Sequence, residues 1–207
     1  MKPISSLSIL ALGLAAALPL QALDNSAKEQ NAQLAFFDSL SSLCGQRFEG
    51  AMTFPTEGQD DFAGKLLVAK IQSCTETEIR VPFAVGEDHS RTWIVSKTER
   101  GLQLKHDHRH EDGTPDEVNM YGGLATAEGS KLSQSFAADA HTAEIIPAAS
   151  TNVWNLTLSS DAKSMTYHLT RHDAPRFTAK LFSTASLVAT PATSQEQGKA
   201  LPTKTEK

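Results

Sequence analysis

The chain has 207 residues, a formal net charge of −5 and seven histidines. A mildly acidic chain without a basic patch argues against a nucleic acid partner, and against docking on anionic lipid by charge alone. The sequence between the two terminal segments described below, roughly 160 residues, is enough for one domain with its own core.

The N-terminal segment has the pattern of an export signal. Lys2 precedes an apolar run over residues 4–20, and residues 20–22 (LQA) offer a small-residue cleavage site. The run is too short to span a bilayer comfortably. We therefore expect residues 1–22 to be a secretory signal peptide, the mature protein to have no membrane span, and its location to be periplasmic or secreted. Removing residues 1–22, which hold one lysine and no acid, lowers the net charge to −6.

The chain has two cysteines, Cys44 and Cys74. In an oxidising compartment an isolated pair most simply forms one disulfide, and the closed loop is worth roughly 3 kcal/mol in the chain-entropy model. A metal site with two thiolate ligands is the alternative. It is disfavoured because the cysteines are far apart in sequence and neither has a CxxC partner.

Residues 27–43 predict an amphipathic helix. Apolar side chains recur there at helical spacing, namely Leu34, Phe36, Phe37, Leu40 and Leu43. Gly45, directly after Cys44, is a plausible C-cap that ends the helix.

After this helix the apolar pattern changes to period two, which is typical of strands. The expected strands cover residues 48–54, 64–74, 78–85, 91–98, 102–110, 118–121, 131–136, 142–146, 152–159, 164–171 and 177–182. Pro82 suggests an edge strand or a bulge, and Gly122-Gly123 is expected to end a strand. About ten short strands with short links predict a mainly β domain over residues 23–183. A sandwich or a closed barrel would fit, and an antiparallel up-and-down meander is favoured. Residues 184–207, rich in Ser, Thr, Ala, Pro, Gln and Lys, are expected to be a disordered tail.

The most distinctive stretch is Leu102 to Gly123, LQLKHDHRHEDGTPDEVNMYGG, which holds His106, His108 and His110 at alternate positions. Alternate residues of a strand share a face, so these imidazoles follow an apolar floor, while Asp107, Arg109 and Glu111 face outward. Imidazole suits zinc and other transition metals, and two histidines at i and i+2 can point at one ion.

The three histidines of this run cannot easily bind one metal ion together on a regular strand. His106 and His110 lie ~13 Å apart along a regular strand, much farther than two zinc–nitrogen bonds of about 2 Å reach. We therefore expect His106 and His108 to be the first ligands of a metal such as zinc, with His110 or His89 completing the set. The alternatives are a polar network that fills a barrel mouth, or an ordinary solvated hairpin tip.

A barrel of this size can also hold one small ligand. Trp93 is one of several aromatic residues on the expected strands, and Arg91 beside it could point a guanidinium at an anionic group of that ligand. A salt bridge to Glu87 or Asp88 is the competing use of Arg91. The expected ligand-binding residues are thus His106, His108, His110, Arg91 and Trp93.

The segment CGQRFEG, residues 44–50, with a helix before it and a long β meander after it, resembles the entry to calycin-type barrels. Those families tend to open the first strand with Gly-x-Trp after a short helix that closes one end; here Phe48 stands where Trp would be. The resemblance implies a lipocalin-like antiparallel barrel, with Arg171 or Arg176 from a late strand packed over Phe48.

The stretches FFDSLSSLCGQRFEG, VGEDHSRTW and LKHDHRHEDGTPDEVNMYGG are also similar to a group of uncharacterised secreted bacterial proteins. This likeness covers most of the mature chain and implies no activity.

Three functions are consistent with these patterns. The first is an exported barrel that binds a small ligand or a transition metal through the histidine-lined site. The second is a metal-dependent hydrolase, in which the ion lowers the pKa of bound water and Asp112 or Glu111 is the local carboxylate. The third is an envelope interaction protein with no small-molecule site.

Overall fold

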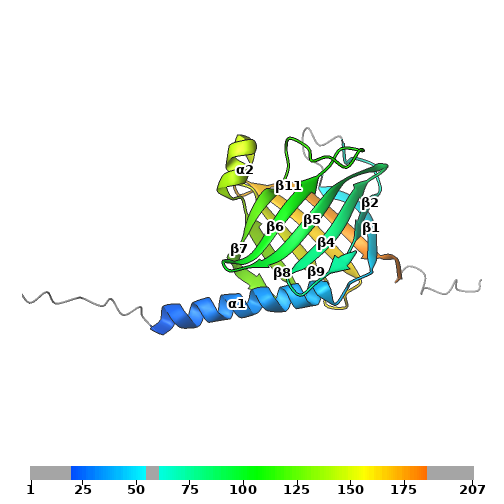
Figure 1. The fold of residues 1–207 in the computed structure, drawn as a ribbon. Coiled ribbons are helices and arrows are strands. Elements are labelled where there is room, and N and C mark those ends of the chain that lie inside the picture. Colours follow the sequence, from blue (N-terminus) through cyan, green and yellow to red (C-terminus); the bar gives the residue numbers. More distant parts are fainter. Residues whose placement is uncertain (1–19, 55–60, 186–207) are drawn as a thin grey trace, which may run out of the picture.

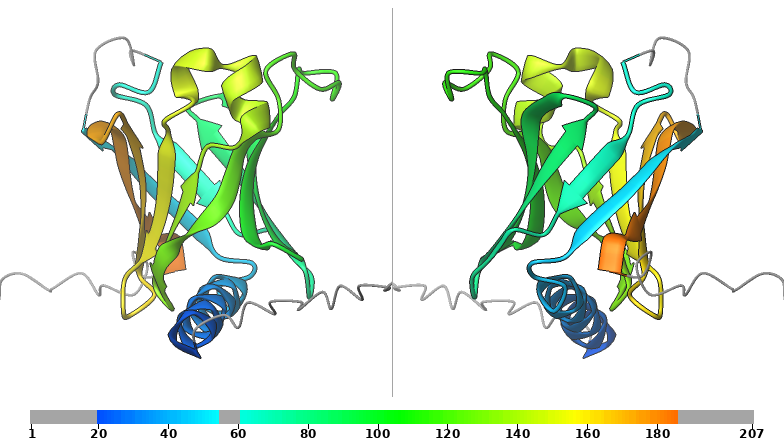
Figure 2. Two further views of the ribbon diagram at one scale, coloured as in Figure 1. Left: turned by 90° about the vertical axis from the view of Figure 1, so that its left-hand side faces the viewer. Right: turned by 90° about the vertical axis from the view of Figure 1, so that its right-hand side faces the viewer.

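The strands close into a barrel, and a long helix lies across one of its ends (Figures 1 and 2). The computed structural model describes residues 20–54 and 61–185. The elements in chain order are α1 (Leu20–Ser41), β1 (Arg47–Phe54), β2 (Leu67–Lys70), β3 (Ser73–Cys74), β4 (Glu78–Val85), β5 (Asp88–Thr98), β6 (Gly101–His108), β7 (Tyr121–Ser130), β8 (Ser133–Ala137), α2 (Ala140–Ile145), the 3-10 turn η1 (Pro147–Ala149), β9 (Val153–Leu158), β10 (Ser164–Arg171) and β11 (Ala174–Ser183).

The sheet is an antiparallel meander that closes on itself. From β4 to β11 each strand pairs with the next one in the sequence, β11 pairs with β1, β1 with β2, and β2 with β4. The two-residue β3 continues along β4 beyond the end of β2. The described strands thus form a closed ten-stranded barrel, which confirms the predicted up-and-down barrel and excludes the sandwich.

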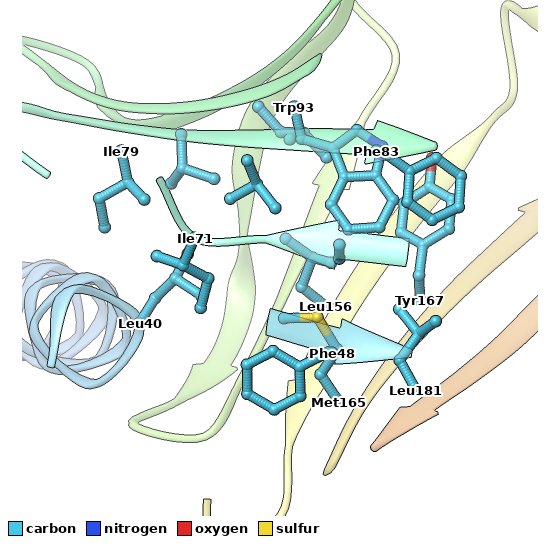
Figure 3. Packing of buried hydrophobic residues seen from close by; sticks show 14 of the residues in the cluster. Leu40, Phe48, Ile71, Ile79, Phe83, Trp93, Leu156, Met165, Tyr167 and Leu181 are labelled. Carbon is cyan, nitrogen blue, oxygen red and sulfur yellow. The ribbon is translucent and has the colours of Figure 1, made fainter. Parts of the chain in front are cut away.

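The core lies inside the barrel because successive side chains alternate between its interior and its outer surface. On β9, for example, Trp154, Leu156 and Leu158 are buried and the residues between them are only partly so. Phe48, Leu156 and Leu181, from three different strands, belong to the same packed cluster (Figure 3).

Helix α1 covers one end of this core with Phe36, Phe37 and Leu40, and the turn after it adds Leu43; all four are buried. Leu34, which we placed on the same stripe, is instead 45% exposed. At ~100° per residue it lies roughly 110° around the helix from the centre of the buried stripe. The helix also begins earlier than expected, at Leu20 rather than at residue 27.

The predicted disulfide between Cys44 and Cys74 is present. It connects the turn after α1 to β3, next to the backbone hydrogen bond that Gly45 donates to Ile71. Gly45 has φ +87°, the left-handed conformation expected of a glycine after a helix. The disulfide therefore ties the helix that covers the barrel end to the barrel wall.

One expected strand, residues 142–146, is instead the helix α2. The Asp139 side chain accepts a hydrogen bond from the Thr142 backbone N–H and caps the helix, while Pro147 follows its end. The Thr142 hydroxyl donates to the Gly122 carbonyl and accepts from the Gly122 N–H, which anchors α2 to the barrel. Cap chemistry therefore outweighed the strand propensity of the Ile145-Ile146 pair.

Gly122 and Gly123 lie inside β7 and do not end a strand, as we had expected. A Cβ on Gly122 would lie 2.0 Å from the Leu104 carbonyl oxygen, and one on Gly123 would lie 1.8 Å from that of Ala137. These glycines therefore allow neighbouring backbones to approach closely, and the strand expected over residues 118–121 begins only at Tyr121.

Two other strand boundaries differ from the prediction. The segment 64–74 is split into β2 and β3, and β6 ends at His108 and not at His110. Pro82 lies between the part of β4 that pairs with β2 and the part that pairs with β3, so its missing N–H interrupts neither ladder. The expected bulge is also found there, as a register shift between Phe83 and Val85.

Two other expectations fall largely outside the described residues. The signal peptide, residues 1–22, falls on the undescribed residues 1–19 and on the first residues of α1. The tail, residues 184–207, falls on the undescribed residues 186–207 apart from its first two residues. No helix in the described ranges is long and apolar enough to cross a membrane.

Replacing both cysteines by serine should lower the free energy of unfolding by about 3 kcal/mol, because the unfolded chain gains the freedom of the opened loop. Urea unfolding of the oxidised protein, the reduced protein and the Cys44→Ser/Cys74→Ser variant measures this. The reduced protein and the double variant should agree. Equal stability of all three would contradict the stabilising role.

Candidate functional site

Figure 1 shows α2 at the end of the barrel opposite α1. A cavity of about 200 Å³ is lined there by Ile146 and Ala149, from the α2–η1 segment, together with barrel strands. Its walls come from β4, β5, β6, β7, β9, β10 and β11, while Ile146 and Ala149 contribute from the α2–η1 segment. Most of the lining side chains are apolar or aromatic. The cavity is therefore the mouth of the barrel interior, and we call it the mouth cavity.

Stacked aromatic rings form the floor and one wall of the mouth cavity. Trp93 lies between Phe83 and Tyr167, with ring centroids 4.4 and 4.5 Å apart respectively and interplanar angles of 22° and 26°. On another wall the His106 and Tyr121 rings stack at 4.6 Å. The lining of the mouth cavity is thus dominated by aromatic rings that are packed against one another.

His106 is buried, and both of its ring nitrogens are engaged. Nδ1 lies 3.1 Å from the Tyr121 carbonyl oxygen, and Nε2 lies 2.7 Å from the Tyr167 hydroxyl. A carbonyl can only accept, so Nδ1 carries the proton and Nε2 accepts from Tyr167. Burial lowers the pKa of His106 to about 3, so the ring is neutral at ordinary pH.

His108 also faces inward, closer to the rim. Its Nε2 lies 2.9 Å from the Tyr121 hydroxyl. Burial, and then the nearby positive charge of Arg91, lowers the pKa of His108. Burial raises the pKa of Tyr121 to about 12 and that of Tyr167 well above its usual value, so both hydroxyls keep their protons.

His110 does not join this pair, although it lies at the next alternate position. The strand ends at His108, Arg109 forms an isolated bridge with Pro115, and His110 is exposed. His89 is exposed in the β4–β5 hairpin, where it lines a separate cavity of about 530 Å³ together with His110. The structure therefore divides the four expected metal ligands between two places.

In the described parts of the chain, no three His, Cys, Asp or Glu side chains are grouped so that they could hold a metal ion. His110 lies beyond the end of β6, and His106 and His108 are hydrogen-bonded to tyrosines. Of the alternatives weighed from the sequence, the polar network at a barrel mouth describes His106 and His108, and the solvated hairpin describes His110.

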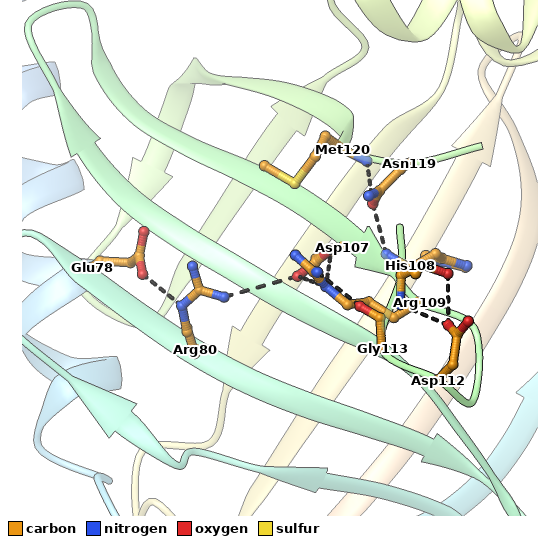
Figure 4. Close-up of polar contacts among 10 residues, drawn as sticks. Glu78, Arg80, Asp107, His108, Arg109, Asp112, Gly113, Asn119 and Met120 are labelled. Carbon is orange, nitrogen blue, oxygen red and sulfur yellow. Dashed lines mark hydrogen bonds and ion pairs between the residues drawn. The ribbon is translucent and has the colours of Figure 1, made fainter. Parts of the chain in front are cut away.

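The outward face of β6 carries a charge network. Asp107 is only 5% exposed because Arg109 and Arg80 lie against it, at 3.1 and 3.9 Å (Figure 4). Arg80 in turn pairs with Glu78 at 2.7 Å. The expected outward direction of Asp107 and Arg109 is thus correct, but the depth at which Asp107 is covered was not foreseen.

Trp93 and Arg91, two of the expected ligand-binding residues, both line the mouth cavity. Arg91 forms a salt bridge with Asp88 and lies 5.5 Å from the ring centroid of Phe62. Burial opposes ionisation of Asp88, but hydrogen bonds from Ser90 and Arg91 outweigh it and hold the pKa at about 2. The competing salt-bridge use of Arg91 is therefore present.

Sequence reasoning missed two polar residues of the mouth cavity, Arg171 and Asn152. The Arg171 Nε donates a 2.8 Å hydrogen bond to Oδ1 of Asn152, which is only 4% exposed. The signal was available, because Arg171 continues the inward-facing alternation of Met165, Tyr167 and Leu169 on β10.

The calycin resemblance instead implied that Arg171 or Arg176 packs over Phe48. Phe48 pairs with Ser183 at one end of β11, whereas Arg171 pairs with Ala174 at the other end of that strand. Arg176 lies near that same far end. Neither arginine therefore reaches Phe48, and the implied contact is wrong.

Comparisons with protein-family models, with curated protein sequences and with solved structures give no match. The likeness to calycin-type barrels and to secreted bacterial proteins therefore stays a prediction from the sequence.

Replacing Tyr167 by phenylalanine should lower the free energy of unfolding by about 1–3 kcal/mol, because it leaves the buried Nε2 of His106 without a donor. Urea unfolding measures the effect. Tyr121→Phe is the matched control, since its hydroxyl bonds to the less buried His108, and its loss should be smaller. A larger loss in the control would contradict this ranking.

His106 should make the protein less stable in acid. The unfolded chain protonates this histidine near pH 6.5, but the folded protein does so only near pH 3. Between these values the unfolded state binds more protons, so the free energy of unfolding should fall by about 1.4 kcal/mol per pH unit as the pH decreases.

Urea titrations of the wild type and of His106→Gln between pH 6.5 and 4 isolate this contribution. The slope should be shallower in the variant, and His89→Gln, which changes an exposed histidine, should keep the wild-type slope. Parallel pH profiles of wild type and His106→Gln would contradict a depressed pKa.

Proposed function

We propose that this protein binds a small organic molecule in the mouth cavity. The observation that carries the proposal is the lining: stacked aromatic side chains with a few convergent polar groups, at the open end of a closed barrel. A concave, mostly apolar pocket with a small number of placed polar groups is the usual form of a ligand site.

The size of the cavity restricts the ligand. Its volume of about 200 Å³ is below the range of about 300–1,000 Å³ that is common for drug-sized ligands. A molecule with one ring and a short substituent suits this space better than a long lipid chain does. A ligand of about ten non-hydrogen atoms that gains roughly 0.4–0.8 kcal/mol per atom, below the ceiling of about 1.5, binds with a dissociation constant in the micromolar to millimolar range, which is the expected range here.

The proposal concerns an organic ligand and not a metal ion because of how the two inward histidines are used. Both ring nitrogens of His106 are occupied, and Nε2 of His108 bonds to Tyr121. A metal would have to displace these hydrogen bonds, and His110 and His89 lie elsewhere. The same geometry disfavours the metal-dependent hydrolase.

The proposed location of this binding is the periplasm or the outside of the cell. The disulfide between Cys44 and Cys74 is compatible with an oxidising compartment. The N-terminal sequence pattern supports export. A small-molecule carrier or sensor would meet its ligand there directly.

The two tryptophans of the chain, Trp93 and Trp154, both line the mouth cavity. Tryptophan fluorescence of the full chain therefore reports on this cavity alone. Titration with a library of one- and two-ring compounds, anionic, cationic and neutral, should give saturable fluorescence changes for a subset of them.

Leu169→Phe adds volume within the cavity lining and should weaken the binding of every such compound at least tenfold. Leu132→Phe makes the same change at a partly buried site that is not part of the lining, and it should bind as the wild type does. The proposal fails if no compound gives a saturable change, or if Leu169→Phe binds all of them unchanged.

A further inference from the structure

Arg171 gives the mouth cavity a chemical preference. We infer that the ligand is a small aromatic carboxylate, whose anionic group binds the Arg171 guanidinium while its ring packs against the aromatic walls. This inference rests on the proposed function and adds the ligand class to it.

Arg171 differs from most other arginines of the described chain in having no acidic partner. Arg47, Arg80, Arg91 and Arg109 each lie within 4.0 Å of a carboxylate oxygen. Within the described ranges Arg171 has no such neighbour, and its side chain bonds to the neutral amide of Asn152. A partly buried cation that lines a cavity without a carboxylate is suited to a ligand that brings one.

Asn152 positions this guanidinium. The Oδ1 atom of this buried residue accepts a 2.8 Å hydrogen bond from the Arg171 Nε, so the Nε edge of the guanidinium group faces Asn152. The two terminal nitrogens then remain for another acceptor, and such a pair matches the two oxygens of a carboxylate. A neutral amide achieves this positioning without cancelling the positive charge.

The electrostatic surroundings favour an anion in the same place. Burial and the nearby charge of Arg176 lower the pKa of Arg171, which means that both disfavour its cation. Arg91 adds a further guanidinium to the cavity lining, although Asp88 partly neutralises it. An anionic group at Arg171 would offset this repulsion, whereas a cationic ligand would increase it.

The aromatic part of the ligand follows from the walls. Trp93 stacks with Tyr167 at 4.5 Å, and the Trp154 ring lies 5.2 Å from His106 and 6.0 Å from Tyr121. Aromatic rings of this kind pack well against a planar ring, in an edge-to-face or an offset-stacked arrangement. With a cavity of about 200 Å³, one ring that carries one carboxylate is the fitting size.

The test compares acids with their uncharged amides, so that ring and size stay constant. The full chain is titrated with benzoate and benzamide, 4-hydroxybenzoate and 4-hydroxybenzamide, and phenylacetate and phenylacetamide, with tryptophan fluorescence as the readout. At least one acid should bind about 10- to 100-fold more tightly than its amide, which is the size of one charge-assisted hydrogen-bonded pair.

Two variants assign this preference to Arg171. Arg171→Gln should bring the affinities of the acid and the amide together by weakening only the acid. Asn152→Asp changes little in shape but gives the guanidinium a carboxylate of its own, and it should also abolish the preference. Arg176→Gln, which changes an arginine outside the cavity lining, should keep most of it.

The outcomes separate the two proposals. Equal binding of acid and amide by the wild type, or an acid preference that survives in both Arg171→Gln and Asn152→Asp, overturns the carboxylate inference and leaves small-molecule binding intact. Binding of neutral library compounds without any of the acids has the same consequence. Failure of every compound, whatever its charge, overturns both.

Discussion

Closure of the sheet is the constraint on which the rest of the structure depends. Once β2 pairs with β4, each of the ten described barrel strands has a neighbour on each side, and alternate side chains are forced into one shared interior. The two ends of that interior then differ in what covers them. Helix α1 covers one end with Phe36, Phe37 and Leu40. At the other end the α2–η1 segment and Phe62 lie beside the cavity.

Nearly all of the described polar groups at the open end are either neutral or paired with a group of opposite charge. His106 is neutral and fully hydrogen-bonded, and the tyrosine hydroxyls that serve it keep their protons. Such a satisfied network holds rings in fixed positions, which stabilises flat walls for a ligand. The histidines of β6 therefore act as positioned parts of the wall, and a role as free ligands would require this network to break.

The sequence was most informative where a regular period decided the outcome. Alternation predicted β9 and β10 nearly residue by residue, and it placed His106 and His108 on the inner face. It failed where one local interaction overrode the period. Asp139 caps the helix α2 where a strand was expected over residues 142–146. Gly122 and Gly123 allow neighbouring backbones to approach closely and lie inside β7, where the end of a strand was expected. His110 was misplaced because alternation cannot show where a strand ends.

Partners across the barrel were beyond sequence reasoning for a different reason. Tyr167 reaches His106 from a strand 61 residues away, and no local pattern encodes that pairing. Alternation marks Arg171 as the last inward-facing position of β10. Its importance, however, depends on the absence of a nearby carboxylate in the described chain, which alternation cannot show. An arginine in that state costs stability through burial and through repulsion from Arg176. The other polar groups described at the open end are hydrogen-bonded or paired. An arginine without an acidic partner at that end is consistent with a residue that is kept for function and not for stability.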